Sequence, residues 1–356
     1  MVDHPLAGRL QALAVAAERW AKADHPARTT ATDRALGAGP PFTEAGVAFA
    51  LNRAMRGLTL EVLTTWAEPL RTAPTSAPEA HPGVGLVSAN PAPLAALADT
   101  LAVVAAGVPA WLHPQADPGG LIRAFLAEAA SMHDTLPAVH PWSRAVQPPV
   151  VVGTIDPEAP PQLAGHAQAL MRPRPVTVAV LDGRESAQAM EGLAEDALLH
   201  DGQADENVRL VWAPADLAPD AVLQAFAEFR AVVPAHPALQ GRLVMQQSLL
   251  EAMGQPHAYG EALEFLLSKG APAFQRAGHL RWTPYDALAE VETWLRDAAS
   301  KGPVTVVTTD RRLAVDGIAG RVCEPGHAHR RPVLAARPPE PVPVFLARVL
   351  AASAQG

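Results

Sequence analysis

Cysteine is almost absent from this sequence, because its 356 residues include a single one, Cys323. One cysteine excludes an internal disulfide bond and any metal site built from several thiolates. Lysine and arginine are sparse as well, and they never form a run longer than two residues. A nucleic-acid-binding surface needs clustered positive charge to neutralise phosphates. With a net charge of −8, this chain is predicted to have no nucleic-acid partner.

Long apolar runs are also missing. No segment approaches the roughly 20 apolar residues that a membrane-spanning helix requires. The first residues, Met-Val-Asp-His-Pro, lack the basic stretch and the apolar stretch of a secretion signal. We therefore expect a cytoplasmic protein without a membrane span.

The chain does contain enough apolar material for a large core. Hydrophobic residues make up 49% of it, and prolines cluster in the stretches 69–82, 157–161 and 332–343. Proline stiffens such connections because its ring fixes φ. A chain of this length can form two domains, or one large domain with insertions.

Residues 1–70 have the pattern of a helical region. Thr43 followed by Glu44, and later Thr59, are helix-start signals before apolar residues at helical spacing. Beyond a linker rich in proline, serine and threonine, short apolar strands alternate with helices up to residue 173. The predicted strands are 83–88, 109–113, 144–147 and 149–153, and the predicted helices are 93–106 and 120–132. This alternation is typical of a parallel sheet with helical crossovers.

A second α/β region spans residues 174–310. Its predicted strands are 176–181, 208–212, 278–282 and 304–308, and its predicted helices are 186–199, 219–232, 244–253, 258–268 and 284–299. A last segment, 311–356, ends in a short predicted helix at 344–350.

The order of these segments resembles that of the LuxC-type acyl-CoA reductases, a family of the aldehyde dehydrogenase superfamily. The similarity extends over residues 41–66, 87–107, 172–183, 193–208 and 325–346. It implies an aldehyde-dehydrogenase-like two-domain α/β fold, in which each domain is a largely parallel sheet flanked by helices. The implied parts are a helical region (1–70) packed on a Rossmann-like cofactor domain (83–173), a catalytic-type domain (174–310) and a C-terminal segment (311–356) that returns to the cofactor domain. The implied reaction is NADPH-dependent reduction of an acyl-CoA to an aldehyde through an acyl-cysteine thioester.

The loop that would carry the nucleophile departs from the family. The family's loop reads Gly-x-Gly-Cys-Arg-Asn-Val, whereas residues 202–208 read Gly-Gln-Ala-Asp-Glu-Asn-Val, with Asp205 at the cysteine position. A carboxylate there could form only an anhydride, which is a poor route to an aldehyde. The resemblance gives Asp205, Asn207 and Glu195 as the candidate catalytic residues, and the substitution implies that the reductase chemistry has been lost.

Cofactor contacts are predicted at the carboxyl ends of strands in the first domain, where ligands of such sheets bind. The candidates are Ser88, His113, Gly153 and Thr154. The family has a lysine where this chain has His113, and a neutral imidazole is a weaker partner for a phosphate than an ammonium group. The resemblance implies NADPH as the cofactor, and we expect it to bind weakly or not at all.

Cys323, His327 and His329 have a spacing that could place three ligands on a zinc ion. The pattern offers no fourth ligand, and the resemblance already accounts for this segment. We expect no metal.

Three hypotheses about function follow. In the first, the chain is a catalytically inactive relative that is retained for binding an acyl-CoA or a related small molecule, or for interaction with a protein. In the second, it is an active acyl-CoA reductase whose nucleophile is displaced. In the third, it is a repurposed thioester hydrolase in which Asp205 acts as a base toward water. Relatives often dimerise, so a homodimer is a further expectation.

Overall fold

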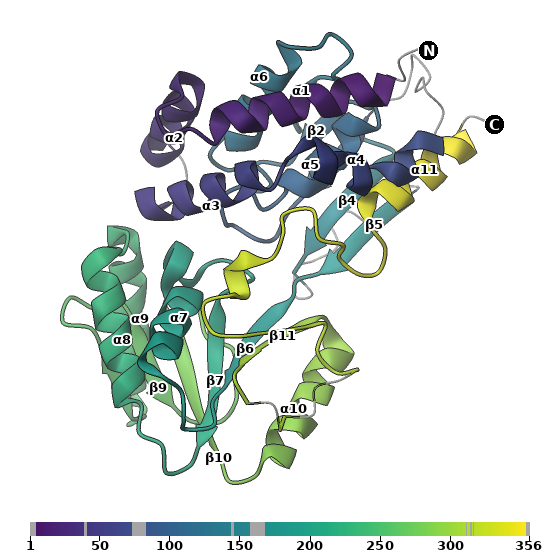
Figure 1. Ribbon diagram of the computed structural model, residues 1–356. Coiled ribbons are helices and arrows are strands. Elements are labelled where there is room, and N and C mark those ends of the chain that lie inside the picture. The colour runs from purple at the N-terminus through teal and green to yellow at the C-terminus, as the bar shows by residue number, and fades with distance from the viewer. Residues whose placement is uncertain are drawn as a thin grey trace. The chain divides into compact units, whose positions relative to one another are not determined.

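The computed structural model describes residues 5–38, 41–72, 83–143, 146–156, 168–310, 312–313, 315 and 317–353. The chain divides into two compact units, which are distinguishable in Figure 1. Unit 1 consists of Met1–Pro173 and Pro332–Gly356, and unit 2 consists of Arg174–Arg331. The chain therefore re-enters unit 1 at Pro332 and not at residue 311, because strand β12 (Arg321–Cys323) pairs with the sheet of unit 2.

Unit 1 is built on a five-stranded sheet in the order β3-β2-β1-β4-β5, in which all neighbouring strands run parallel. Its strands are β1 (Val84–Val87), β2 (Ala110–Leu112), β3 (Val139–Pro141), β4 (Val150–Ile155) and β5 (Gln168–Pro173). The strand β3 lies earlier than the predicted 144–147. Of that predicted strand, residues 146 and 147 are not in a strand, and residues 144 and 145 lie outside the described residues. The sequence pattern did not predict β5.

The helices of unit 1 come from both ends of the chain. They are α1 (Pro5–Trp20), α2 (Pro26–Ala38), α3 (Glu44–Arg56), α4 (Leu60–Trp66), α5 (Leu97–Ala105), α6 (Leu121–Ala130) and α11 (Val342–Ser353), with the 3-10 helix η1 (Glu68–Thr72). The hydroxyl of Thr43 accepts a hydrogen bond from the N–H of Gly46 (3.1 Å) at the start of α3. The hydroxyl of Thr59 accepts a hydrogen bond from the N–H of Val62 (3.3 Å) at the start of α4. Both threonines cap helices, as the sequence predicted.

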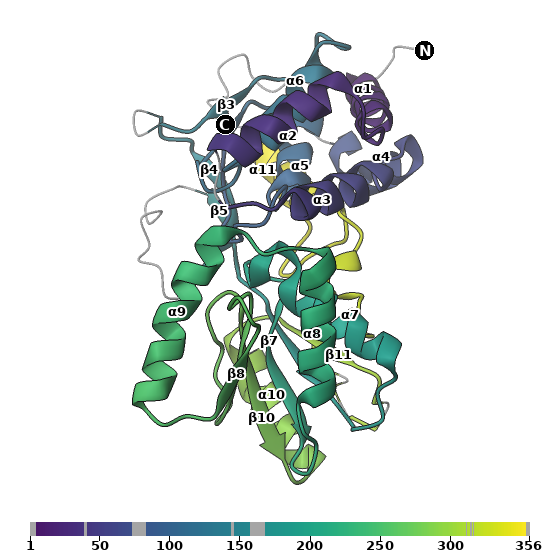
Figure 2. The ribbon, with the colours of Figure 1, turned by 90° about the vertical axis from the view of Figure 1, so that its left-hand side faces the viewer.

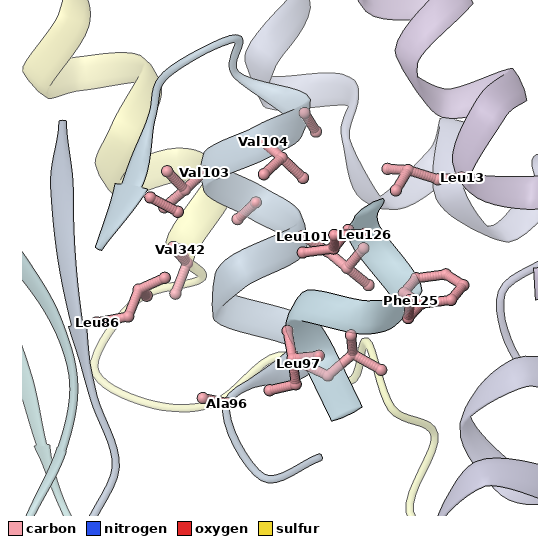
Figure 3. Packing of buried hydrophobic residues seen from close by; sticks show 14 of the residues in the cluster. Leu13, Leu86, Ala96, Leu97, Leu101, Val103, Val104, Phe125, Leu126 and Val342 are labelled. Carbon is pink, nitrogen blue, oxygen red and sulfur yellow. The ribbon is translucent and has the colours of Figure 1, made fainter. Parts of the chain in front are cut away.

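The core of unit 1 surrounds α5. This helix is apolar on nearly all sides, as is typical of a helix that its neighbours bury completely. Leu97 and Leu101 of α5 are fully buried, as are Leu13 of α1 and Phe125 of α6. Figure 3 shows these side chains together with Val342 of α11. The C-terminal helix thus completes a core that begins with the N-terminal helix.

Unit 2 contains a seven-stranded sheet in the order β12-β11-β6-β7-β10-β9-β8, parallel except for the pair β8 and β9. Its other strands are β6 (Val176–Val180), β7 (Val208–Pro214), β8 (His257–Tyr259), β9 (Leu266–Lys269), β10 (His279–Tyr285) and β11 (Val304–Thr308). Its α-helices are α7 (Ala187–Leu198), α8 (Asp220–Val232), α9 (Pro237–Ala252) and α10 (Leu288–Lys301) (Figure 2). Its 3-10 helices are η2 (Leu199–Gly202) and η3 (Ala328–Arg330).

Helices cover both faces of this second sheet. Ala179 of β6 packs in the cluster that includes α7 and α8, whereas its neighbours Val178 and Val180 pack in the cluster that includes α10. Successive side chains of a strand point to opposite faces, so a strand buried on both sides is apolar throughout.

One predicted helix is wrong. Residues 258–268 contain the end of β8 and most of β9, because the short apolar run at 265–267 fits a buried strand as well as a helix. Parallel pairing of β9 with β10 decides between the two. Helix α9 begins at Pro237, earlier than the predicted 244. His236 precedes it as the N-cap, and its ring accepts a hydrogen bond from the N–H of Ala238 (3.1 Å).

The α/β class and the two largely parallel sheets flanked by helices are confirmed. Among the helices that the structure describes, none is both long enough and apolar enough to cross a membrane.

Candidate functional site

The loop between α7 and β7 carries the position that the sequence singles out. Its backbone turns sharply, since His200 and Asp201 have φ values of 54° and 55°. The amide of Asn207 holds this turn: its nitrogen donates to the carbonyl of Leu199 (2.8 Å), and its oxygen accepts from the N–H of Ala204 (2.8 Å). Asn207 is 1% exposed. These amide contacts are made within unit 2. A catalytic role for Asn207 stays a prediction.

Asp205 is buried in the same loop, with a side chain that is 0% exposed. Its Oδ1 lies 2.7 Å from both Nε and Nη2 of Arg174, which lies two residues before the start of β6. The hydroxyl of Thr177 on β6 donates to the backbone carbonyl of Asp205 (2.9 Å). The loop is therefore fastened to the start of β6 by a charged contact and a neutral one.

Burial raises the pKa of Asp205 to about 6, and the positive charge of Arg174 opposes that rise. The neighbouring Glu206 adds to it. Oδ2 is buried and accepts no hydrogen bond from the described part of the chain. The carboxyl group thus has one oxygen held in an ion pair and one without a hydrogen bond.

The predicted cofactor positions lie at the carboxyl end of the sheet in unit 1. The Ser88 hydroxyl donates to the carbonyl of Asn90 (3.1 Å), and the N–H of Ala89 donates to the carbonyl of Thr154 (3.1 Å). A Cβ at Gly153 would lie 1.9 Å from the carbonyl oxygen of Val87, so β1 and β4 approach closely there. The structure brings Ser88, Gly153 and Thr154 together, and their polar groups bond to the loop after β1.

His113 follows β2 at the same edge. Its Nδ1 accepts a hydrogen bond from the N–H of Gln115 (3.3 Å), and its ring meets the ring of Trp142 edge-on, 6.3 Å between centroids. Burial lowers the pKa of His113. The imidazole is therefore neutral at neutral pH and brings no positive charge to this edge.

Comparison with known proteins identifies the fold. No family model matches the chain, and no curated protein matches its sequence. Solved structures do match. An NAD-dependent benzaldehyde dehydrogenase from Corynebacterium glutamicum aligns with a TM-score of 0.66 at 14% identity, over 90% of this chain and 82% of that one. An indole-3-acetaldehyde dehydrogenase complexed with NAD+ aligns with a TM-score of 0.67 at 14% identity, over 96% of this chain and 82% of that one. Aldehyde dehydrogenase 21 from Physcomitrella patens aligns with a TM-score of 0.66 at 13% identity, over 96% of this chain and 84% of that one.

The chain has an aldehyde-dehydrogenase-like fold. At such low identity the likeness carries the fold alone, and function lies in the particular residues placed on it.

Within the aldehyde-dehydrogenase-like fold, the structure does not join Glu195 to Asp205. Glu195 on α7 forms a two-pronged ion pair with Arg330, whose Nη2 lies 2.9 Å from Oε1 and 3.0 Å from Oε2. The two side chains are 23% and 52% exposed, so the pair is only partly shielded from water. The catalytic role of Glu195 stays a prediction.

Asp196, the next residue, organises the end of unit 2. It is fully buried, and its carboxylate accepts hydrogen bonds from the N–H groups of Gly326 (2.7 Å) and Ala328 (3.0 Å). Burial raises its pKa to about 7, against the lowering effect of these two donors. His329 follows Ala328, and its Nε2 lies 3.1 Å from the amide nitrogen of Asn207. The signal in the sequence is the pair of acids, Glu195 and Asp196, within the otherwise apolar stretch 193–199.

The described part of the chain contains no group of three or more histidine, cysteine or acidic residues placed to hold a metal. Cys323 lies on β12 and is half-buried. Burial raises the pKa of its thiol to about 11.

Proposed function

We propose that this chain is a catalytically inactive relative of the LuxC-type acyl-CoA reductases, retained for binding an acyl-CoA or a related small molecule, or for interaction with a protein. The observation that carries this proposal is the ion pair of Asp205 with Arg174. A reductase of this kind needs a thiolate that is reachable by the thioester. The residue at that loop position is instead a carboxyl group with a fully buried side chain that anchors the loop.

NADPH-dependent chemistry finds little support in unit 1. The polar groups of Ser88 and Thr154 are hydrogen-bonded to neighbouring loop residues, and His113 is neutral at neutral pH. A phosphate group would need positive charge or free N–H donors at this edge. These residues do not fit a nicotinamide cofactor well, and we infer that NADPH binds weakly or not at all.

A displaced nucleophile is the weaker alternative. Cys323 is the only cysteine, and with a thiol pKa of about 11 roughly one molecule in ten thousand carries the thiolate at pH 7. A thiol in that state attacks a thioester slowly.

Thioester hydrolysis is the second candidate, and one observation favours it. The pKa of Asp205 is about 6, which lies close to the range of an effective general base, and its Oδ2 has no hydrogen bond from the described residues. Full burial of the side chain opposes this function, since the carboxyl group would need to reach water beside a bound thioester.

The test measures three readouts on the full chain with acyl-CoAs of several chain lengths. NADPH oxidation is followed by absorbance, CoA release by a thiol-reactive dye, and acyl-CoA binding by calorimetry. The proposal expects no oxidation and no CoA release that depends on Asp205, with binding as the remaining activity. NADPH oxidation at a rate comparable to active reductases would overturn it, and CoA release that is lost in Asp205→Asn would establish the hydrolase instead.

A further inference from the structure

A cavity of about 420 Å³ lies between α2 and α6 in unit 1, and none of the candidate catalytic or cofactor residues lines it. Its charged lining residues are Arg34 on α2 and Arg123 on α6. The rest of the lining is small, and consists of Pro118, Gly119, Gly120, Ala124 and Ala127. This volume is within the roughly 300–1,000 Å³ of small-molecule sites in proteins.

Two glycines shape the cavity. A Cβ at Gly119 would lie 2.8 Å from the Cβ of Ala35, so the loop before α6 packs directly against α2. Gly120 has a φ of 72°, and a Cβ there would lie 3.4 Å from Nη2 of Arg123. Glycine at these two positions therefore brings the loop close to α2 and leaves the guanidinium of Arg123 uncovered on that side.

The charged side chains that line the cavity are both positive, and one of them is paired with the carboxylate of Asp117. Nε of Arg123 lies 3.0 Å from Oδ2 of Asp117, a buried carboxylate. Asp117 also accepts from the N–H groups of Ile122 (2.9 Å) and of Arg123 (3.2 Å), so it already satisfies the start of α6. The site consequently depends on the two guanidinium groups and not on the helix end.

Arg34 supplies the unbalanced charge. It is exposed, and no hydrogen bond or ion pair joins its guanidinium to another residue in the described ranges. Asp33 beside it is exposed and does not line the cavity. With Arg123 paired through Nε to Asp117, its Nη groups and the whole of Arg34 are available to an anion.

We propose that this cavity binds the phosphate group of a small phosphate-bearing molecule, held between Arg34 and Arg123. A guanidinium presents its N–H groups in a planar fork that matches phosphate oxygens, and two forks on facing helices can share one phosphate. The alanine and proline walls then accommodate the uncharged part of the molecule. The site does not depend on the function proposed for Asp205, so either proposal can fail without the other.

The test titrates the full chain with inorganic phosphate, adenosine monophosphate and adenosine by calorimetry. Phosphate and adenosine monophosphate should bind saturably, and adenosine should not. Tighter binding of the monophosphate would assign the site to a phosphate ester, and equal binding would assign it to free phosphate. Failure of both anions to saturate the wild-type chain, or binding of adenosine as tight as that of its monophosphate, would overturn the proposal.

Matched variants locate the site. Arg34→Ala and Arg123→Ala should each weaken phosphate binding about tenfold or more, since each removes a charge-assisted contact. Ala127→Leu keeps both charges, fills the cavity from the exposed side of α6 and should also abolish binding. Arg71→Ala is the control, because Arg71 is an exposed arginine of the same unit that pairs with Glu68 outside the cavity. A loss in Arg71→Ala equal to that in Arg34→Ala would show nonspecific attraction and refute the site.

Discussion

Both Nε and Nη2 of Arg174 lie 2.7 Å from Oδ1 of Asp205, and this ion pair holds the α7–β7 loop against the first residues of β6. The aspartate side chain is 0% exposed and the arginine side chain is 21% exposed. A buried carboxylate of this kind depends on its partner, because the loss of one member leaves an uncompensated charge.

Arg174→Met is therefore expected to destabilise the protein by about 2–4 kcal/mol, and to raise the pKa of Asp205 further. Urea denaturation at pH 7 measures the free energy of unfolding. The double variant Arg174→Met with Asp205→Asn should lose less than the sum of the two single variants, since no buried charge remains. Strict additivity would contradict an energetic role for the pair.

The titration of Asp205 predicts a pH effect with a definite sign. Burial raises its pKa from 3.8 to about 6, so between these pH values the folded state holds a proton that the unfolded state releases. The contribution of this carboxyl group to stability is full below the lower value and is lost as pH rises through the upper one. The stability of Asp205→Asn relative to wild type should therefore increase with pH across this window. The measurement is urea denaturation of both proteins at several pH values, in which the titrations of Asp196 and His279 cancel. A difference that does not vary with pH would contradict the assignment.

A chain of three hydrogen-bonded polar side chains in unit 2, of which His279 and Ser268 are buried, predicts an effect on stability. Nδ1 of His279 lies 2.8 Å from Oε1 of Gln246, and Nε2 lies 2.7 Å from the hydroxyl of Ser268. Because the amide oxygen only accepts, Nδ1 carries the proton and Nε2 accepts from the serine. Burial lowers the pKa of His279 to about 4, which keeps the ring neutral.

Ser268→Ala leaves Nε2 of His279 buried without a partner and should cost about 1–3 kcal/mol. Ser248→Ala is the matched control, since the exposed Ser248 hydroxyl donates to the carbonyl one turn earlier in α9. Thermal denaturation should show a clear loss for the first variant and almost none for the second. Equal effects would mean that the network adds nothing.

Gly153 predicts a steric effect at the edge of the first sheet. A Cβ there would approach the carbonyl oxygen of Val87 to 1.9 Å, and neither backbone can move without disturbing the β1–β4 pairing. Gly153→Ala should lower the melting temperature by several degrees, about 2 kcal/mol or more. Gly37→Ala lies within α2 with no atom within 4 Å of the new Cβ, and should raise stability slightly. An unchanged melting temperature for Gly153→Ala would contradict the close approach.

The pattern of residues decided much of the fold in advance. Local periodicity marks the apolar strands 176–180 and 304–308, and local hydrogen bonds explain the threonine caps at 43 and 59. Such features can be predicted from the sequence alone. The presence of Asp205 beside Glu206 is equally a property of the loop's own sequence. Together these determined an α/β chain with two largely parallel sheets and an acidic loop at residues 202–208.

Other features required contacts between residues far apart in the chain. Residues 265–267 suit either a helix or a strand, and pairing with β10 decides in favour of the strand. The carboxylate of Asp196 accepts a hydrogen bond from the N–H of Gly326, 130 residues further along the chain, and no local sequence pattern predicts this contact. The burial of Asp205 beside Arg174 has the same origin, since a side chain's exposure and partners are set by packing between elements. The sequence determined that an aspartate lies at position 205, and only the tertiary structure turned that side chain into a member of a buried ion pair with a raised pKa.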